Sequence, residues 1–172
     1  GVDIDKIKEP NHDGLTRGLE NLDKHISNLQ HYGQTVVVAF NRYATDTDEE
    51  IDIVRTHCAE MGVGFAVNNA FNEGGKGAEE LARLVVQTIE EKPSAALQLA
   101  YDDNDSVEAK IEKVSTKVYG AKNVTFSAEA NKKLKMIYDM GYDKFPVCIA
   151  KTQYSFSTDP KLYGVAKGFT VN

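Results

Sequence analysis

The sequence is short of cysteine and of basic charge. Its two cysteines, Cys58 in a predicted helix and Cys148 in a predicted strand, are too few for a disulfide scaffold, and we expect both to be reduced, buried thiols. Twenty basic residues against twenty-six acidic ones give a net charge of −6 at pH 7. That balance argues against a nucleic-acid partner, because the lysines and arginines do not cluster.

Long apolar runs are also absent. No apolar stretch approaches the roughly 20 residues that a membrane-spanning helix needs. The polar stretch 1–14 lacks the apolar core of a signal peptide. We therefore expect a cytoplasmic protein without a membrane partner.

Common patterns of nucleotide, metal and acyl-transfer sites are missing as well. The glycine-rich run 74–77 is not a Walker motif, because Lys76 is followed by Gly77 and not by Ser or Thr. The histidines show no metal-ligand spacing, and no group of Ser, His and Asp can be placed together. The sequence predicts no metal site and no catalytic residue. The four histidines are His12, His25, His31 and His57.

What is present is an alternation of helices and strands. Apolar residues recur at helical spacing over 13–32, 48–61 and 78–91, and short apolar or β-branched runs lie between them at 35–40 and 65–67. Such alternation is typical of a parallel sheet with crossover helices. We predict an α/β fold, a three-layer Rossmann-like domain with a mainly parallel sheet whose strands are covered on both faces.

The second half is less regular and predicts a small α+β appendage. We expect, in chain order, a linker at 93–105, a helix at 105–119, a short strand at 123–126, a helix at 127–140, a buried strand at 145–150 and a final strand at 168–171. Asp105 and Ser127 are the expected N-caps of the two helices. The chain thus divides into a βα-repeat part, 1–92, and a helix and strand-loop part, 93–172, which we expect to pack as one compact unit.

Polar and aromatic side chains follow the ends of the first two strands. Asn41, Arg42 and Tyr43 come directly after the first strand, and Phe71 follows the second. Because the carboxyl ends of parallel strands lie along one edge, we expect Tyr43 and Phe71 to lie near each other. Two rings at that edge could clamp a flat heterocycle by stacking, or either could be an ordinary packing residue.

Two further segments leave alternatives open. The glycines at 74–77 precede a helix, where backbone amides can approach an anion, but they are equally typical of a structural turn. Lys151 follows a predicted buried strand, and it either faces an anionic ligand or extends harmlessly to solvent.

Three stretches resemble formate tetrahydrofolate ligase, also called 10-formyltetrahydrofolate synthetase. They are VVVAFNRYATDTDEEI at 36–51, NEGGKGAEELA at 72–82 and FPVCIAKTQYSFSTDPKLYG at 145–164. The third is long and specific, and the resemblance covers essentially the whole chain. It implies a cytoplasmic, homotetrameric ligase that uses ATP with Mg²⁺ to join formate to tetrahydrofolate through formyl phosphate, giving 10-formyltetrahydrofolate, ADP and phosphate.

The chains of that family are much longer than this one, and their phosphate-binding P-loop lies in an amino-terminal domain. Since residues 1–172 contain no P-loop, the resemblance implies an internal piece of the enzyme that works with the P-loop domain of the same chain. ATP is then bound mainly by that other domain. The piece supplies the folate side of the active site and is expected to be inactive alone.

The resemblance also assigns residues to the folate site. Tyr43 and Phe71 match the two aromatic residues that hold the folate ring, usually Phe and Trp, and Arg42 and Ala44 flank Tyr43. Ala44 replaces a usual proline, which implies a looser loop. The residues expected to line the cleft are Asn41, Gly74, Gly75, Gly77, Lys151, Thr152 and Gln153.

Two other interpretations stay open from the residues alone. One is a free-standing α/β ligand-binding domain of the receiver or flavodoxin-like type, although Asn41, Arg42 and Tyr43 are not the acidic cluster that a receiver needs. The other is a structural piece without catalysis, whose two aromatic residues pack against another domain and bind no ligand.

Overall fold

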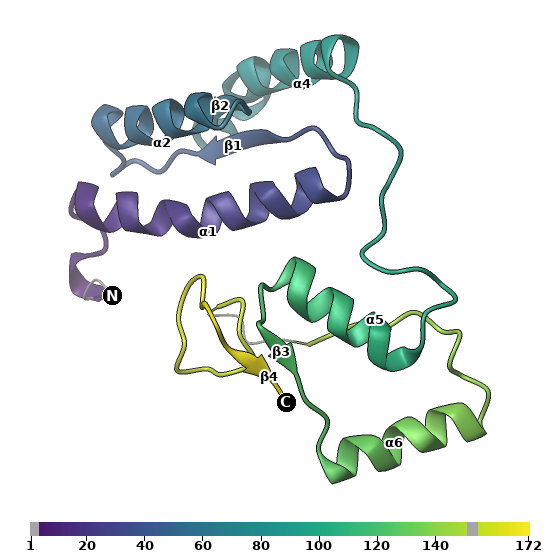
Figure 1. Ribbon diagram of the computed structural model, residues 1–172. Coiled ribbons are helices and arrows are strands. Elements are labelled where there is room, and N and C mark those ends of the chain that lie inside the picture. The colour runs from purple at the N-terminus through teal and green to yellow at the C-terminus, as the bar shows by residue number, and fades with distance from the viewer. Residues whose placement is uncertain (1–3, 151–154) are drawn as a thin grey trace. The chain divides into compact units, whose positions relative to one another are not determined.

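The structure is a computed structural model that describes residues 4–150 and 155–172 (Figure 1). Its internal contacts divide the chain into two compact units, Gly1–Leu97 and Gln98–Asn172. This division falls close to the predicted boundary after residue 92. The packing of the two parts as one body stays a prediction.

The first unit alternates helices and parallel strands. Its elements, in chain order, are η1 (Ile4–Lys6), α1 (His12–His31), β1 (Val37–Asn41), α2 (Asp48–Glu60), β2 (Gly64–Asn68), α3 (Ala70–Glu73), η2 (Gly74–Ala78) and α4 (Glu79–Glu91). The long helices and both strands lie within a few residues of their predicted positions. The predicted α/β fold class is confirmed.

Local side chains fix the helix ends in this unit. The Asn11 side chain accepts a hydrogen bond from the Gly14 backbone N–H at the start of α1, and Gly33, with a φ of 79°, follows the end of that helix. Thr47 and Glu50 form the predicted capping box at the start of α2. These residues satisfy backbone groups that the helices leave unpaired, so the helices end where the sequence indicates.

β1 and β2 pair in parallel as a two-stranded sheet. The register joins Val37 to Gly64 at one end and Asn41 to Asn68 at the other. Successive side chains along a strand point to opposite faces, so both asparagines lie on the same face as Val37. The carboxyl ends of the two strands therefore lie side by side.

Helices pack on both faces of this sheet. On one face, Phe65 packs against a core whose buried members include Ile26 of α1 and Cys58 of α2. On the other face, a Cβ added at Gly64 would lie 3.4 Å from the methyl groups of Leu84 in α4. Figure 1 shows β1 between α1 and α4. The unit thus has the predicted order of helix, sheet and helix.

The cover on β1 is thinner than the sequence predicts. Val36 is buried, but Val37 and Val38 are half-buried and Ala39 is exposed. The expectation that this strand is covered on both faces is therefore wrong in part. Among the residues that the structure describes, β2 alone pairs with β1, so the outer edge of β1 is open.

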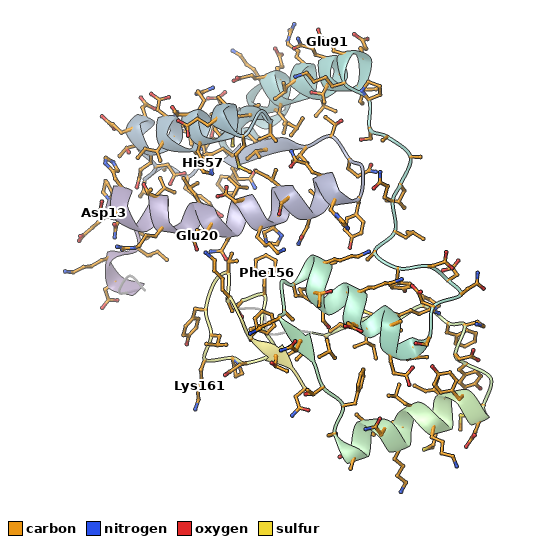
Figure 2. The ribbon with its side chains drawn as sticks, viewed as in Figure 1. Asp13, Glu20, His57, Glu91, Phe156 and Lys161 are labelled. Carbon is orange, nitrogen blue, oxygen red and sulfur yellow. The ribbon has the colours of Figure 1, made fainter. Side chains whose placement is uncertain are left out.

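A polar contact joins α1 to α2 beside the core. Nε2 of His57, labelled in Figure 2, lies 2.5 Å from Oδ1 of Asp23.

Burial, together with the charge of Asp23, raises the pKa of the neighbouring Cys58 thiol. Cys58 is free and completely buried, which confirms the sequence-based expectation for this cysteine.

The second unit holds shorter elements. They are α5 (Val107–Lys113), the π-helical turn η3 (Val114–Val118), β3 (Asn123–Val124), α6 (Ala128–Asp139) and β4 (Thr170–Val171). Ser106, and not the predicted Asp105, caps α5, because the Ser106 side chain accepts a hydrogen bond from the Ala109 backbone N–H. Ser127 caps α6 as predicted. β3 and β4 pair in parallel.

The buried strand predicted at 145–150 is wrong. The segment forms no ladder with another strand in the described part of the chain. Instead, the Tyr101 hydroxyl accepts a hydrogen bond from the Val147 N–H at 2.9 Å. The Tyr119 hydroxyl donates to the Ile149 carbonyl oxygen at 3.4 Å. Side-chain hydroxyls thus take the place of a neighbouring strand.

The loss of this strand also changes the setting of the second cysteine. Cys148 is exposed, so the expectation of a buried thiol is wrong at this position. The physical reason is that no described strand pairs with the segment that carries it. In residues 4–150 and 155–172, no helix is both long and apolar enough to cross a bilayer.

Candidate functional site

The strongest candidate site is a cleft at the carboxyl ends of β1 and β2. Its volume is about 380 Å³, within the range of roughly 300–1,000 Å³ that is typical of small-molecule sites. Open α/β sheets bind ligands at such strand ends. The lining residues come from the strand ends, the loop after β1 and α3, and they are Asn41, Arg42, Tyr43, Ala44, Asn68, Phe71 and Asn72.

Two asparagine side chains form a bridge across the strand ends. Nδ2 of Asn68 donates a hydrogen bond to Oδ1 of Asn41 at 2.9 Å. The Arg42 backbone N–H continues the ladder by donating to the Asn68 carbonyl oxygen at 3.0 Å. Oδ1 of Asn68 accepts a hydrogen bond from the Ala70 N–H at 3.2 Å, where α3 begins. Asn68 thus ties β1, β2 and α3 together at the cleft.

Acidic side chains hold the loop that carries Tyr43. The Asp46 carboxylate accepts a hydrogen bond from the Tyr43 backbone N–H at 2.7 Å, and the Asp46 N–H donates to the Tyr43 carbonyl oxygen at 3.1 Å. Arg42 pairs with Asp48 at 2.9 Å. Ala44 therefore lies in a turn closed by these contacts, without the fixed φ that a proline would supply.

The two aromatic rings of the cleft are exposed. Tyr43 is 72% exposed, and Phe71, in α3, is 97% exposed. Both rings line the same cleft. Their exposure excludes the interpretation that either ring belongs to the core of this unit, and it leaves both π faces available to a flat ligand.

The glycine-rich run is a helical turn rather than a loop. Residues 74–78 form the 3₁₀ turn η2. A Cβ added at Gly77 would lie 2.5 Å from the backbone carbonyl carbon and oxygen of Asn69, so this glycine permits close packing against the residues that follow β2. Gly74, Gly75 and Gly77 lie outside the set that lines the cleft. A role for them in ligand binding stays a prediction.

Three predicted cleft residues, Lys151, Thr152 and Gln153, lie outside the residues that the structure describes, and their role stays a prediction. Within the described residues, no group of three or more His, Cys, Asp and Glu side chains could hold a metal ion. The cleft itself offers amides, one guanidinium group and two aromatic rings. These groups suit a planar organic ligand with polar atoms at its edge.

Two cleft residues were missed by sequence reasoning. Asn68 and Asn72 line the cleft beside the predicted residues. The position of Asn68 could have indicated its role, because Asn68 ends the second strand as Asn41 ends the first. Asn72 directly follows Phe71, and its position in the short helix α3 carries no periodic pattern.

The capping box beside the cleft loop holds an ionised carboxylate. Glu50 accepts hydrogen bonds from the backbone N–H groups of Thr47, at 3.1 Å, and Asn11, at 3.2 Å. The bond from Thr47 is the main cause that holds the pKa of Glu50 below its ordinary value of 4.5, although burial acts in the opposite direction. The charged form of Glu50 therefore stabilises the start of α2, which follows the loop of Tyr43.

The whole chain matches one protein family. Residues 1–172 match the family described as Formate--tetrahydrofolate ligase. Curated proteins of the same description include one from Phocaeicola vulgatus, 64% identical over 169 residues, and one from Bacteroides fragilis, 59% identical over 172 residues. A third, from Campylobacter concisus, is 50% identical over 167 residues.

These relatives are much longer than the chain. The alignments cover 98%, 100% and 96% of this chain, but 30%, 31% and 30% of the three relatives in the same order. The chain thus spans less than a third of the length of each of them. Since the match runs from the first residue to the last at these identities, the chain belongs to the formate–tetrahydrofolate ligase family.

Proposed function

We propose that this chain is the folate-binding side of the active site of a formate–tetrahydrofolate ligase. The observation that carries the proposal is the pair of exposed rings, Tyr43 and Phe71, that line one cleft. A pterin is a flat heterocycle, and two aromatic faces can hold such a ring by stacking. The family match supports folate as the ligand, because the relatives are described by that substrate.

The intact enzyme uses ATP with Mg²⁺ to convert formate to formyl phosphate. The amine nitrogen of tetrahydrofolate then bonds to the formyl carbon and loses its proton, and the bond from that carbon to the phosphate oxygen breaks as phosphate leaves. Such a transfer needs the amine and the acyl carbon in a fixed geometry. The cleft contributes by holding the pterin, while its own residues take no chemical part.

ATP and Mg²⁺ are bound by another part of the protein. Phosphoryl chemistry needs amide or cationic donors around the phosphate oxygens. In the described residues the best candidate, the glycine run 74–77, is folded into η2, and the Gly77 carbonyl oxygen accepts a hydrogen bond from the Asn69 N–H at 2.9 Å. This turn does not fit a phosphate cradle. The intact enzyme works as a cytoplasmic homotetramer, and residues 1–172 alone are inactive.

A titration with tetrahydrofolate or a stable folate analogue tests the folate site. Quenching of tyrosine fluorescence is expected to be saturable in the full-length protein. Phe71→Ala keeps Tyr43 as reporter and is expected to raise the dissociation constant about tenfold or more, because one stacking face is lost. Tyr142→Ala, which removes an exposed tyrosine of the second unit, is the matched control and should leave the affinity unchanged.

An unchanged affinity in Phe71→Ala would contradict the stacking role. The inactivity of the chain has a separate test. Formation of ADP from ATP that depends on both formate and tetrahydrofolate, by residues 1–172 alone, would overturn that part of the proposal.

A further inference from the structure

The side-chain amide of Asn41 presents an unused donor at the cleft. Its Oδ1 accepts the hydrogen bond from Nδ2 of Asn68, so its own nitrogen is not the bridging atom. An amide nitrogen carries two N–H donors. Within residues 4–150 and 155–172, Nδ2 of Asn41 donates to no protein acceptor. Asn41 is exposed and lines the cleft, so this donor is accessible to a ligand.

The orientation of the Asn68 amide is determined at both ends. Its nitrogen donates to Asn41, and its oxygen accepts from the Ala70 N–H. If the Asn68 amide were flipped, its oxygen would face Oδ1 of Asn41 and its nitrogen would face the Ala70 N–H. Both contacts would then be unfavourable. Because Asn68 cannot flip, the oxygen of Asn41 stays on the bridge and the nitrogen of Asn41 stays available.

Stacking alone does not select one ring edge from another. Tyr43 and Phe71 offer π faces, and a π face accepts any flat heterocycle of suitable size. A polar group that hydrogen-bonds the ligand selects more strongly, because a ligand without the matching atom covers that group and leaves it unpaired. Asn41 lines the same cleft as the two rings, and its hydrogen bond with Asn68 leaves its amide nitrogen as the available donor.

We propose that Asn41 donates a hydrogen bond to the exocyclic oxygen of the bound pterin, and that Asn68 is the positioning residue that sets this donor. The proposal rests on the proposed function, because it takes a pterin as the ligand. It narrows the ligand class to flat heterocycles with an oxo group at one edge. If the ring has an amino group at that place, its N–H donors face the N–H donors of Asn41, and the ligand binds weakly.

Two ligands that differ at this one group test the proposal in the full-length protein. The first is folate, and the second is aminopterin, in which an amino group replaces the ring oxo group. The wild-type protein is expected to bind folate about tenfold or more tightly than aminopterin, as the loss of one directed hydrogen bond predicts. The ratio of the two dissociation constants is the readout, since it does not depend on the fraction of protein that is folded.

Asn41→Asp is the first variant. A carboxylate oxygen still accepts the hydrogen bond from Asn68, so the bridge is kept, but the free donor becomes an acceptor. Folate is expected to bind about tenfold more weakly, and aminopterin to become the preferred ligand. If Asn41 only supported the fold, Asn41→Asp would weaken the binding of both ligands equally.

Asn68→Asp is the second variant. Its carboxylate keeps an acceptor for the Ala70 N–H at the start of α3 but loses the donor to Asn41. Asn41 then turns its own nitrogen toward the new carboxylate, and the ratio of the two dissociation constants falls toward one. Asn21→Asp is the matched control, because it adds the same charge to α1 of the first unit, outside the cleft lining, and should keep the wild-type ratio.

The outcomes separate this inference from the proposed function. A wild-type ratio in both Asn41→Asp and Asn68→Asp, together with weaker binding of both ligands in Phe71→Ala, would overturn the role of the bridge and leave the folate site standing. Absence of saturable binding by the wild-type protein, or no effect of Phe71→Ala, would overturn the folate site and this inference with it.

Discussion

Lys110 is completely buried, and its ammonium group donates a hydrogen bond to the carbonyl oxygen of Phe145 at 3.2 Å. A second bond of the same length goes to the carbonyl oxygen of Asp143, and the Tyr101 ring centroid lies 5.8 Å from Nζ. A buried lysine is rare unless its charge is satisfied by partners. Lys110 therefore fastens the start of the segment 143–150 to α5.

Lys110→Met is expected to destabilise the chain by about 1–3 kcal/mol, because methionine fills similar space but leaves two carbonyl oxygens without their donor. Urea unfolding followed by circular dichroism measures the change. Lys135→Met, at an exposed position of α6, is the control and should change the unfolding free energy by less than about 0.5 kcal/mol. Equal unfolding midpoints for the two variants would contradict the role of Lys110.

The first unit was predictable from sequence because its signals are local. The capping box of Thr47 and Glu50 and the glycine after α1 lie within a few residues of the helix ends that they determine. Parallel strand ends also follow from alternation alone, and this brought Tyr43 and Phe71 to one cleft. The exposure of Ala39 was not predictable, since it depends on which strands flank β1.

The errors lie where distant side chains decide the structure. An apolar run at 145–150 has the composition of a buried strand, but Tyr101 and Lys110, far away in sequence, supply the groups that hold this part of the chain. The bridge between Asn41 and Asn68 depends on how two amides are turned, and no periodicity encodes that orientation.

Glu50 is expected to couple stability to pH. Its folded-state pKa lies below the ordinary 4.5, so its stabilisation is fully present above that value and is lost as the pH falls through the folded pKa. Glu50→Gln should lower the unfolding free energy at neutral pH by about 0.3–1 kcal/mol, because glutamine can keep a capping hydrogen bond but loses the negative charge at the start of α2. Below 4.5 the difference from the wild type should shrink.

Denaturant unfolding at neutral pH and near pH 3 measures this difference. Glu49→Gln is the matched control, because Glu49 also lies in the first turn of α2 but is not part of the capping box. A deficit in Glu50→Gln that is the same at both pH values would show that the cap does not depend on the charge.

Gly77→Ala is expected to destabilise the first unit. The added Cβ would meet the Asn69 backbone at 2.5 Å, and relief of such a clash costs about 1–3 kcal/mol. Gly75→Ala is the control, because no heavy atom lies within 4 Å of a Cβ at that position. Thermal unfolding should show a lower midpoint for Gly77→Ala only. Equal midpoints for the two variants would mean that η2 does not pack against Asn69 as described.

Phe71→Ala should leave the stability of the chain within about 0.5 kcal/mol of the wild type, because a ring that is 97% exposed has little packing to lose. Ile26→Ala, at a position that is 1% exposed, should cost about 2–5 kcal/mol.

The same Phe71→Ala change in the full-length protein separates the two interpretations of the ring. A selective rise in the KM for tetrahydrofolate with an unchanged Tm indicates stacking on the ligand. A lower Tm would indicate that Phe71 packs against the rest of the protein, and the proposed folate site would then lack one of its two stacking rings.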